Sequence, residues 1–132
     1  GKSVCTLKTP GAGSVRGEWE VESGDFGQGF AALCKLSGVE LPPFSALKPF
    51  CGARFTRLAK AVTVAGCTLE IALDRGVLLG SGKEEPLCEV EVELKEGSED
   101  ACVAFSAALA AEFDLCPEAK SKFKRALALT EN

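Results

Sequence analysis

Carboxylates occupy every second position of one stretch near the middle of the chain. Between Leu87 and Leu94, Glu89, Glu91 and Glu93 alternate with apolar residues. Side chains of a β-strand point alternately to its two faces, so these three carboxylates are expected on one face. Neighbouring negative charges repel unless a cation lies over them. The stretch therefore predicts either a solvated acidic face of a surface strand or a site that gathers cations.

Ionic side chains also alternate with apolar ones in four other segments that we predict to be strands. The ionic residues of these four segments are Lys8, Arg16, Glu18, Glu20, either Arg57 or Lys60, Glu70 and Asp74. A flat sheet would turn these charges to water, whereas a curled sheet would bring them into one cavity, where buried charges persist only when paired or bound to metal. Mixed carboxylates and bases suit a metal-bound polyphosphate. Carboxylates hold Mg²⁺ or Mn²⁺, and Arg and Lys neutralise phosphate oxygens.

Missing residue types narrow the chemistry further. The chain has no histidine, so nucleophiles of the Ser-His and Cys-His kinds cannot be built, and proton transfer must use carboxylates, lysine or metal-activated water. Its seven cysteines include no Cys-x-x-Cys pair. We therefore expect no zinc site, and we expect most of the thiols to be small buried hydrophobes.

Length and composition predict one soluble globular domain, because 132 residues with 46% hydrophobic and 26% charged side chains can bury a single core. The chain contains no apolar run long enough to cross a membrane and no signal-peptide pattern, so we expect a cytoplasmic protein without a membrane partner. A net charge of -4 gives no reason to expect a nucleic-acid partner. Since no methionine opens the chain, we expect its natural N-terminus upstream.

The strands that carry these charges are predicted from period-two alternation. Residues 3–8 and 15–22 are expected to form a hairpin, and 55–64 and 68–74 a second hairpin around a Gly66 turn. Residues 75–83 contain Gly76, Gly80 and Gly82, so we predict an irregular linker there. The apolar faces of the strands are expected to pack against helices.

Four helices are predicted, near residues 28–37, near 43–48 after two prolines, after Ser98, and from Pro117. The hydroxyl of Ser98 and the acids that follow it suit a helix start. We expect this third helix to carry an apolar stripe of Ala101, Phe105, Ala108, Leu109 and Phe113. The last helix holds a basic group of Lys120, Lys122, Lys124 and Arg125.

Six segments of the chain, in order, resemble the CYTH or triphosphate tunnel metalloenzyme family, which includes inorganic triphosphatases, thiamine triphosphatases and class IV adenylate cyclases. The segments are Thr6-Leu7-Lys8, Arg16-x-Glu18-x-Glu20, Phe55-Thr56-Arg57, Glu70 to Asp74, Glu85 to Leu94, and Ser121-Lys122-x-x-Arg125. Among these proteins the bacterial inorganic triphosphatases are the most similar.

The resemblance implies an α+β fold in which an antiparallel β-barrel encloses a charged tunnel, with helices on its flanks. Residues 1–132 would form a single CYTH-like domain. The family's first Glu-x-Glu-x-Lys strand and a later Arg-x-Arg strand are not found here. We therefore expect the C-terminal two-thirds of the domain, with the missing N-terminal segment as its natural partner.

The resemblance also implies metal-dependent hydrolysis of inorganic or organic triphosphate by water attack, with Mg²⁺ or Mn²⁺ as cofactor. The implied metal residues are Glu18, Asp74, Glu89 and Glu91, with Glu20 and Glu93 as weaker candidates. The implied phosphate-binding residues are Lys8, Arg16, Arg57, Lys122 and Arg125, with Lys120 as a substitute, and the implied catalytic residues are Glu18, Lys8 and Arg57. The alternatives are a non-catalytic module that binds polyphosphate or nucleotide phosphates, an activity like that of class IV adenylate cyclases, and a scaffold whose charges face water.

Overall fold

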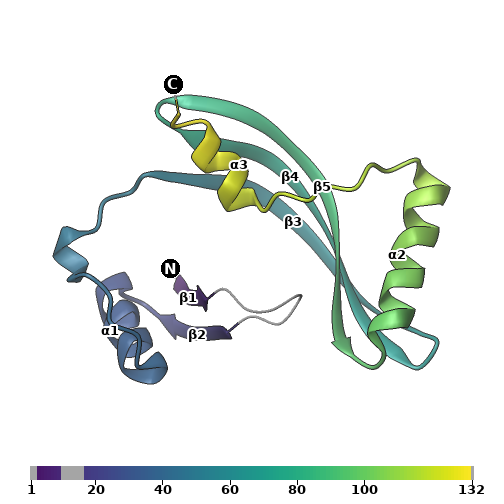
Figure 1. Ribbon diagram of the computed structural model, residues 1–132, viewed down its shortest axis with the longest axis horizontal. Coiled ribbons are helices and arrows are strands. Elements are labelled where there is room, and N and C mark those ends of the chain that lie inside the picture. Colours follow the sequence, from purple (N-terminus) through teal and green to yellow (C-terminus); the bar gives the residue numbers. More distant parts are fainter. Residues whose placement is uncertain (1–2, 10–16, 132) are drawn as a thin grey trace. The chain divides into compact units, whose positions relative to one another are not determined.

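The computed structural model describes residues 3–9 and 17–131 of the chain. The chain divides into two compact units, Gly1–Lys48 and Pro49–Asn132, which are described separately. The strands and helices of both units are labelled in Figure 1. Among the described residues, no helix has the length and apolar character needed to cross a membrane.

The first unit is an antiparallel hairpin with a helix packed on it. Strands β1, Ser3–Thr9, and β2, Gly17–Ser23, confirm the predicted hairpin. Helix α1, Phe26–Ser37, begins slightly before the predicted start, because the Asp25 carboxylate caps it by accepting from the Gln28 amide at 2.9 Å. The Arg16 side chain and the rest of the 10–16 connection lie outside the described residues.

The predicted second helix near residues 43–48 is only a single 3-10 turn, η1, Phe44–Ala46. Proline explains the short length. A residue before proline avoids the helical conformation, and Pro49 places this restriction on Lys48. The helix prediction for this segment is therefore wrong in type and extent.

The second unit is built on three long antiparallel strands in the order β3-β4-β5. Their bounds are Cys51–Val64, Cys67–Gly80 and Lys83–Glu96. Two-residue turns join them, and the turn residues Ala65, Gly66, Ser81 and Gly82 all have positive φ. Turns with two positive φ values match the twist of the strands they join, which explains why the chain reverses so tightly.

The prediction of an irregular linker over 75–83 is wrong, because residues up to Gly80 continue β4 and Lys83 already belongs to β5. The glycines serve close packing inside a regular strand. A Cβ on Gly76 would lie 2.1 Å from the Arg54 carbonyl oxygen, and one on Gly80 would lie 2.7 Å from the Ala126 carbonyl oxygen. Glycine within a strand often marks such a close approach.

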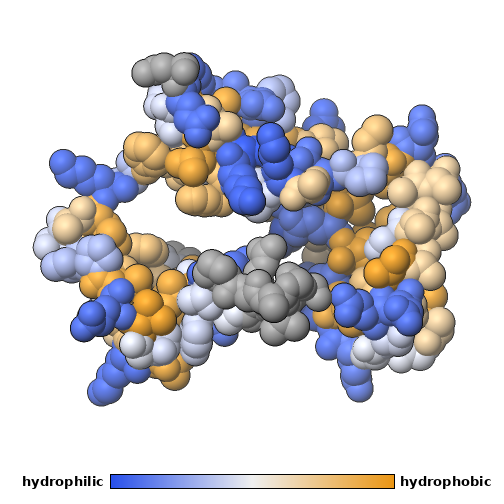
Figure 2. Space-filling view, in the orientation of Figure 1, coloured by the Kyte–Doolittle hydropathy of each residue, from blue (hydrophilic) through white to orange (hydrophobic). Residues whose placement is uncertain are grey.

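Helix α2, Glu99–Phe113, confirms the predicted helix after Ser98, whose hydroxyl accepts from the Ala101 amide at 3.4 Å. The predicted apolar stripe is only partly right, since Ala108 and Phe113 are exposed and no residue of α2 is fully buried. Hydrophobic colours accordingly extend over α2 in the space-filling view (Figure 2). A single helix face packed against the end of one sheet buries little area.

Helix α3, Lys122–Ala128, does not begin at Pro117 as predicted. The Glu118 carboxylate accepts from the Lys120 amide at 3.0 Å, at a bend just before the helix. The Ser121 hydroxyl then caps the helix by accepting from the Lys124 amide at 3.1 Å. Local capping by Ser121 therefore decides where α3 starts.

The core of the second unit lies between α3 and one face of the sheet, where Leu78, Leu87 and Ala126 are buried and Cys51 and Leu129 pack beside them. Leu78 shares the strand period of Asp74, so α3 covers the face that carries the charges. We predicted that helices would cover the opposite, apolar face. That prediction is wrong over much of the sheet, since Leu58 and Leu73 on that face are 68% and 49% exposed.

Strand pairing corrects the expectation of a closed barrel. The described strands form two separate antiparallel sheets, β1-β2 and β3-β4-β5, instead of one closed barrel. Each sheet is made only of strands that follow one another along the chain, because hairpin pairing is local.

The expectation that most thiols are buried is also corrected. Of the seven cysteines, only Cys5 and Cys67 are buried, while Cys88 and Cys116 are exposed.

Candidate active site

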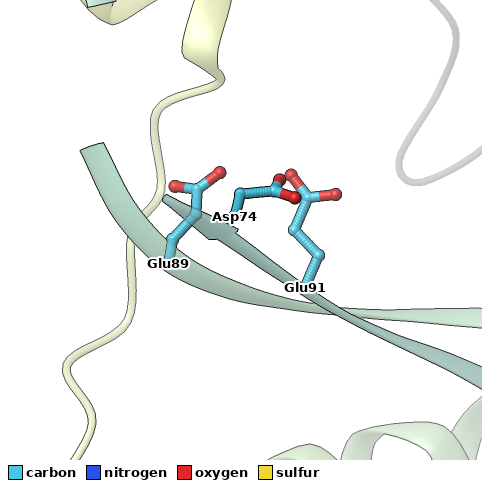
Figure 3. Close-up of side chains that lie close together, drawn as sticks. All are labelled: Asp74, Glu89 and Glu91. Atoms are coloured by element: carbon cyan, nitrogen blue, oxygen red, sulfur yellow. The ribbon is translucent and has the colours of Figure 1, made fainter. Parts of the chain in front are cut away.

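A row of charged residues crosses the three-stranded sheet at its middle. Arg57 on β3 lies opposite Asp74 on β4, and Asp74 lies opposite Glu89 on β5. Directly opposed residues point to the same face, and Glu91 joins them because it is two positions beyond Glu89. We call Asp74, Glu89 and Glu91 the carboxylate cluster. Figure 3 shows these three side chains extending from two neighbouring strands into one region.

Asp74 is the centre of the carboxylate cluster and is only 1% exposed. Arg57 donates two hydrogen bonds to Asp74, from Nε to Oδ1 at 2.6 Å and from Nη2 to Oδ2 at 2.7 Å. The hydrogen bond from Arg57 is the main reason why the pKa of Asp74 falls to about 2, although burial opposes the shift. The same pair raises the pKa of Arg57. Both groups are therefore ionised at neutral pH.

Lys122 is the first residue of α3, and its side chain contacts all three residues of the carboxylate cluster. Its Nζ lies 2.8 Å from Asp74 Oδ2, 2.5 Å from Glu89 Oε1 and 2.5 Å from Glu91 Oε1. Burial alone would lower the pKa of Lys122, but these hydrogen bonds outweigh it and raise the pKa. The Lys122 ammonium therefore stays protonated at neutral pH and lies among three negatively charged carboxylates.

Arg125, one turn further along α3, completes the ion network. Its Nη2 lies 2.5 Å from Glu89 Oε2, and Arg57 Nη2 lies 3.2 Å from Glu91 Oε2. Burial opposes ionisation of Glu89, but hydrogen bonds from Lys122 and Arg125 lower its pKa. Three cations thus balance three carboxylates, which is how ionic groups persist in a partly buried site.

The carboxylate cluster has the donor chemistry of a divalent cation site. One oxygen from each of its three residues lies within 4.8 Å of the others. Carboxylate oxygens are the hard ligands that Mg²⁺ and Mn²⁺ prefer. The residues present therefore fit such an ion by type and by proximity.

Phe55 belongs to the Phe55-Thr56-Arg57 segment of the resemblance, but no role in the site was predicted for it. Its ring centroid lies 5.4 Å from the Arg57 guanidinium carbon and 5.1 Å from Lys122 Nζ. A cation over an aromatic face is stabilised by the ring's negative charge density. Phe55 lies opposite Gly76, which has no side chain to displace the ring. Strand period places Phe55 on the same face as Arg57, and the pairing with Gly76 leaves room for its ring.

The structure decides two alternatives that the sequence left open. Arg57 and not Lys60 contacts the carboxylate cluster, because Lys60 lies opposite Ile71 on the other face of the sheet. Lys122 and not Lys120 supplies the ammonium, since Lys122 Nζ pairs with all three carboxylates of the cluster.

Other predicted site residues lie outside this network. Glu93 is exposed and pairs with Lys95 at 3.3 Å. The predicted alternative of a carboxylate facing solvent therefore holds for Glu93, whereas Asp74 is buried. Lys8 and Glu18 belong to the first unit, where they lie opposite each other on the β1-β2 hairpin, as Thr6 and Glu20 do. Arg16 is outside the described residues.

Comparison with known proteins places the chain in a family. Residues 1–127 match the CYTH domain, and the chain belongs to that family. The match covers nearly the whole chain and leaves the predicted restriction to the C-terminal two-thirds of the domain a prediction.

A curated relative is the inorganic triphosphatase of Haemophilus influenzae, to which the chain is 33% identical over 95 residues. The aligned region is 72% of this chain and 27% of the relative, so the chain spans about a quarter of that protein's length. No solved structure matches the chain.

Proposed function

We propose that this chain takes part in the metal-dependent hydrolysis of a triphosphate, with inorganic triphosphate as the first candidate substrate. The observation that carries the proposal is the convergence of three carboxylates and three basic side chains on one sheet face of a CYTH-family chain. Similarity to an inorganic triphosphatase supports the choice of substrate class. The cytoplasmic location stays a prediction.

The proposed metal ligands are Asp74, Glu89 and Glu91, with Glu18 of the first unit as a fourth. Mg²⁺ or Mn²⁺ is proposed because all of these donors are carboxylate oxygens. When bound, the ion neutralises charge on phosphoryl oxygens and polarises the bond that breaks.

The basic residues would bind the substrate. Arg57 and Arg125 offer planar forks of donors that suit phosphate oxygens, and Lys122 offers a compact charge. Lys8 and Arg16 of the first unit are proposed as further phosphate contacts, in a charged β-tunnel of the kind implied by the family. These cations orient the triphosphate and stabilise the charge that develops during transfer.

Water attack on the terminal phosphorus requires a residue that orients the water. We propose Glu18 for this role, with Lys8 and Arg57 beside the reacting phosphoryl group. A carboxylate is the available choice in a chain without histidine.

The test is release of phosphate from inorganic triphosphate by the full chain with Mg²⁺ or Mn²⁺. Glu89→Gln and Glu91→Gln should each lower kcat/KM at least about tenfold, because each replaces a charged carboxylate with a neutral amide that binds a divalent ion more weakly. Glu93→Gln is the matched control on the same strand face and should change the rate less than about twofold, because that carboxylate is exposed. Losses below tenfold for both cluster variants would contradict the proposal.

The second candidate is a non-catalytic module that binds polyphosphate or nucleotide phosphates. The observation that favours it is that each carboxylate of the cluster is already paired with protein cations. This candidate requires calorimetric binding of inorganic triphosphate without turnover under either metal. Turnover that depends on Glu89 and Glu91 would exclude it.

A further inference from the structure

Each of the six oxygens of the carboxylate cluster contacts a basic side chain, and Lys122 contacts three of them. Its ammonium takes one oxygen from each residue, Asp74 Oδ2, Glu89 Oε1 and Glu91 Oε1. None of the other basic side chains described in the site contacts all three carboxylates. Lys122 therefore has the contact pattern that a metal ion bound by the cluster would have.

The other three oxygens are held by arginine. Arg57 donates to Asp74 Oδ1 and Glu91 Oε2, and Arg125 lies against Glu89 Oε2. Each carboxylate is thus fixed from a second side. If Lys122 moved away, the three oxygens it contacts would remain directed toward the same point.

We propose that the Lys122 ammonium and the divalent cation exclude each other, so that cation binding releases Lys122 from the carboxylate cluster. This inference rests on the proposed function for the existence of a cation site. Mg²⁺ lies about 2.1 Å from its oxygen ligands. Because Nζ is 2.8 Å or less from these oxygens, an ion sharing one of them would lie within about 5 Å of the ammonium. Two cations at that separation repel strongly.

Lys122 is the cation that can leave. The Arg57 guanidinium is held by two hydrogen bonds to the buried Asp74, whereas an ammonium is a point charge on a flexible stem. Helix α3 can stay in place, because Ala126 packs in the core and Leu129 packs against it. Release therefore needs only a side-chain rotation, and it turns a charge that neutralised carboxylates into one available to phosphate.

The first test is Mn²⁺ binding by calorimetry to the full chain in phosphate-free buffer. Lys122→Gln should tighten Mn²⁺ binding at least about tenfold, because it removes a competing charge. Lys122→Arg keeps a positive charge there and should stay within about threefold of the unchanged protein. Lys124→Gln is the matched control, since Lys124 is exposed on the same helix. Equal or weaker Mn²⁺ binding by Lys122→Gln would overturn the inference.

The second test follows the ammonium itself. Labelling by an amine-specific acylating reagent, measured by mass spectrometry, should be slow at Lys122 and fast at Lys124 without metal. Saturating Mg²⁺ should raise the Lys122 rate at least about threefold relative to Lys124, because an amine released from the three carboxylates gains access to the reagent. An unchanged ratio at saturation would overturn the exchange.

These outcomes separate the inference from the proposed function. Metal-dependent phosphate release combined with unchanged Mn²⁺ affinity in Lys122→Gln would refute only the exchange. Tighter Mn²⁺ binding by Lys122→Gln, together with no phosphate release by the unchanged protein, would support the exchange and refute hydrolysis. If neither protein binds Mn²⁺, both fail.

Discussion

Asp74 is the residue on which the ion network depends. It is buried, its Oδ1 accepts from Arg57, and its Oδ2 accepts from both Arg57 and Lys122. Removing one partner of a buried ion pair leaves an uncompensated charge, which costs about 3–5 kcal/mol. The residue is therefore a structural requirement of the second unit as well as a proposed metal ligand.

Acid stability provides a prediction for Asp74. Its pKa is about 2 in the folded chain against an ordinary 3.8, so the folded state binds its proton less readily than the unfolded state. The resulting stabilisation, about 2 kcal/mol, is fully present above pH 4 and is lost as the pH falls toward 2. The difference in unfolding free energy between the unchanged protein and Asp74→Asn, measured with urea, should shrink over that range. A difference that stays constant from pH 5 to pH 2 would contradict this account.

At the scale of elements, the site depends on how closely α3 approaches the sheet. Leu78 and Leu87 of the sheet and Ala126 of α3 form one buried group, and the basic residues Lys122 and Arg125 lie on the same helix. Apolar packing therefore fixes the helix whose charged side chains reach the carboxylate cluster. A seven-residue helix is too short to be stable without such contacts.

Gly80→Ala tests this docking. The added Cβ would lie 2.7 Å from the Ala126 carbonyl oxygen and 3.0 Å from Leu129 Cβ, so α3 must shift. We expect a loss of about 1–3 kcal/mol in the free energy of unfolding, measured with urea. The matched control is Gly52→Ala on β3, where a Cβ meets nothing within 4 Å. It should change stability by less than about 1 kcal/mol. Equal effects of the two substitutions would refute close docking as the reason for Gly80.

At the scale of the whole molecule, the proposed function requires residues from both units. The second unit contains the carboxylate cluster and its three cations, and the first unit contains Lys8 and Glu18, opposed on its hairpin. The CYTH match over residues 1–127 includes residues of both units. An activity that needed only the second unit would make the hairpin dispensable.

Lys8→Gln tests this requirement. If Lys8 contacts the triphosphate, the substitution should lower kcat/KM for its hydrolysis at least about tenfold, since a charged contact to phosphate is lost. Thermal unfolding should be little changed. Lys35→Gln, in the last turn of α1, is the control within the same unit and should be neutral. Retention of more than half of the activity by Lys8→Gln would remove the first unit from the proposed site.

Much of the local structure was predictable, because strand period and helix capping depend on neighbouring residues. The alternation of Glu89 and Glu91 predicted a strand with its carboxylates on one face, and Ser98 predicted the start of α2. The β1-β2 hairpin was predictable for the same reason. The glycine-rich stretch was mispredicted because sequence does not distinguish a glycine that turns the chain from one that lets a neighbour approach. Gly76 and Gly80 are of the second kind.

What the sequence by itself determined about this protein is its inventory of carboxylates and bases, their period and the resemblance to a family. Only the tertiary structure decided which of them meet. Arg57, Asp74 and Glu89 are brought together by the register of three strands, and Lys122 is chosen over Lys120 by the start of α3 and its docking. Ion pairing acts over a few ångströms between residues far apart in the chain. Its partners are therefore set by strand register and helix placement and not by sequence spacing.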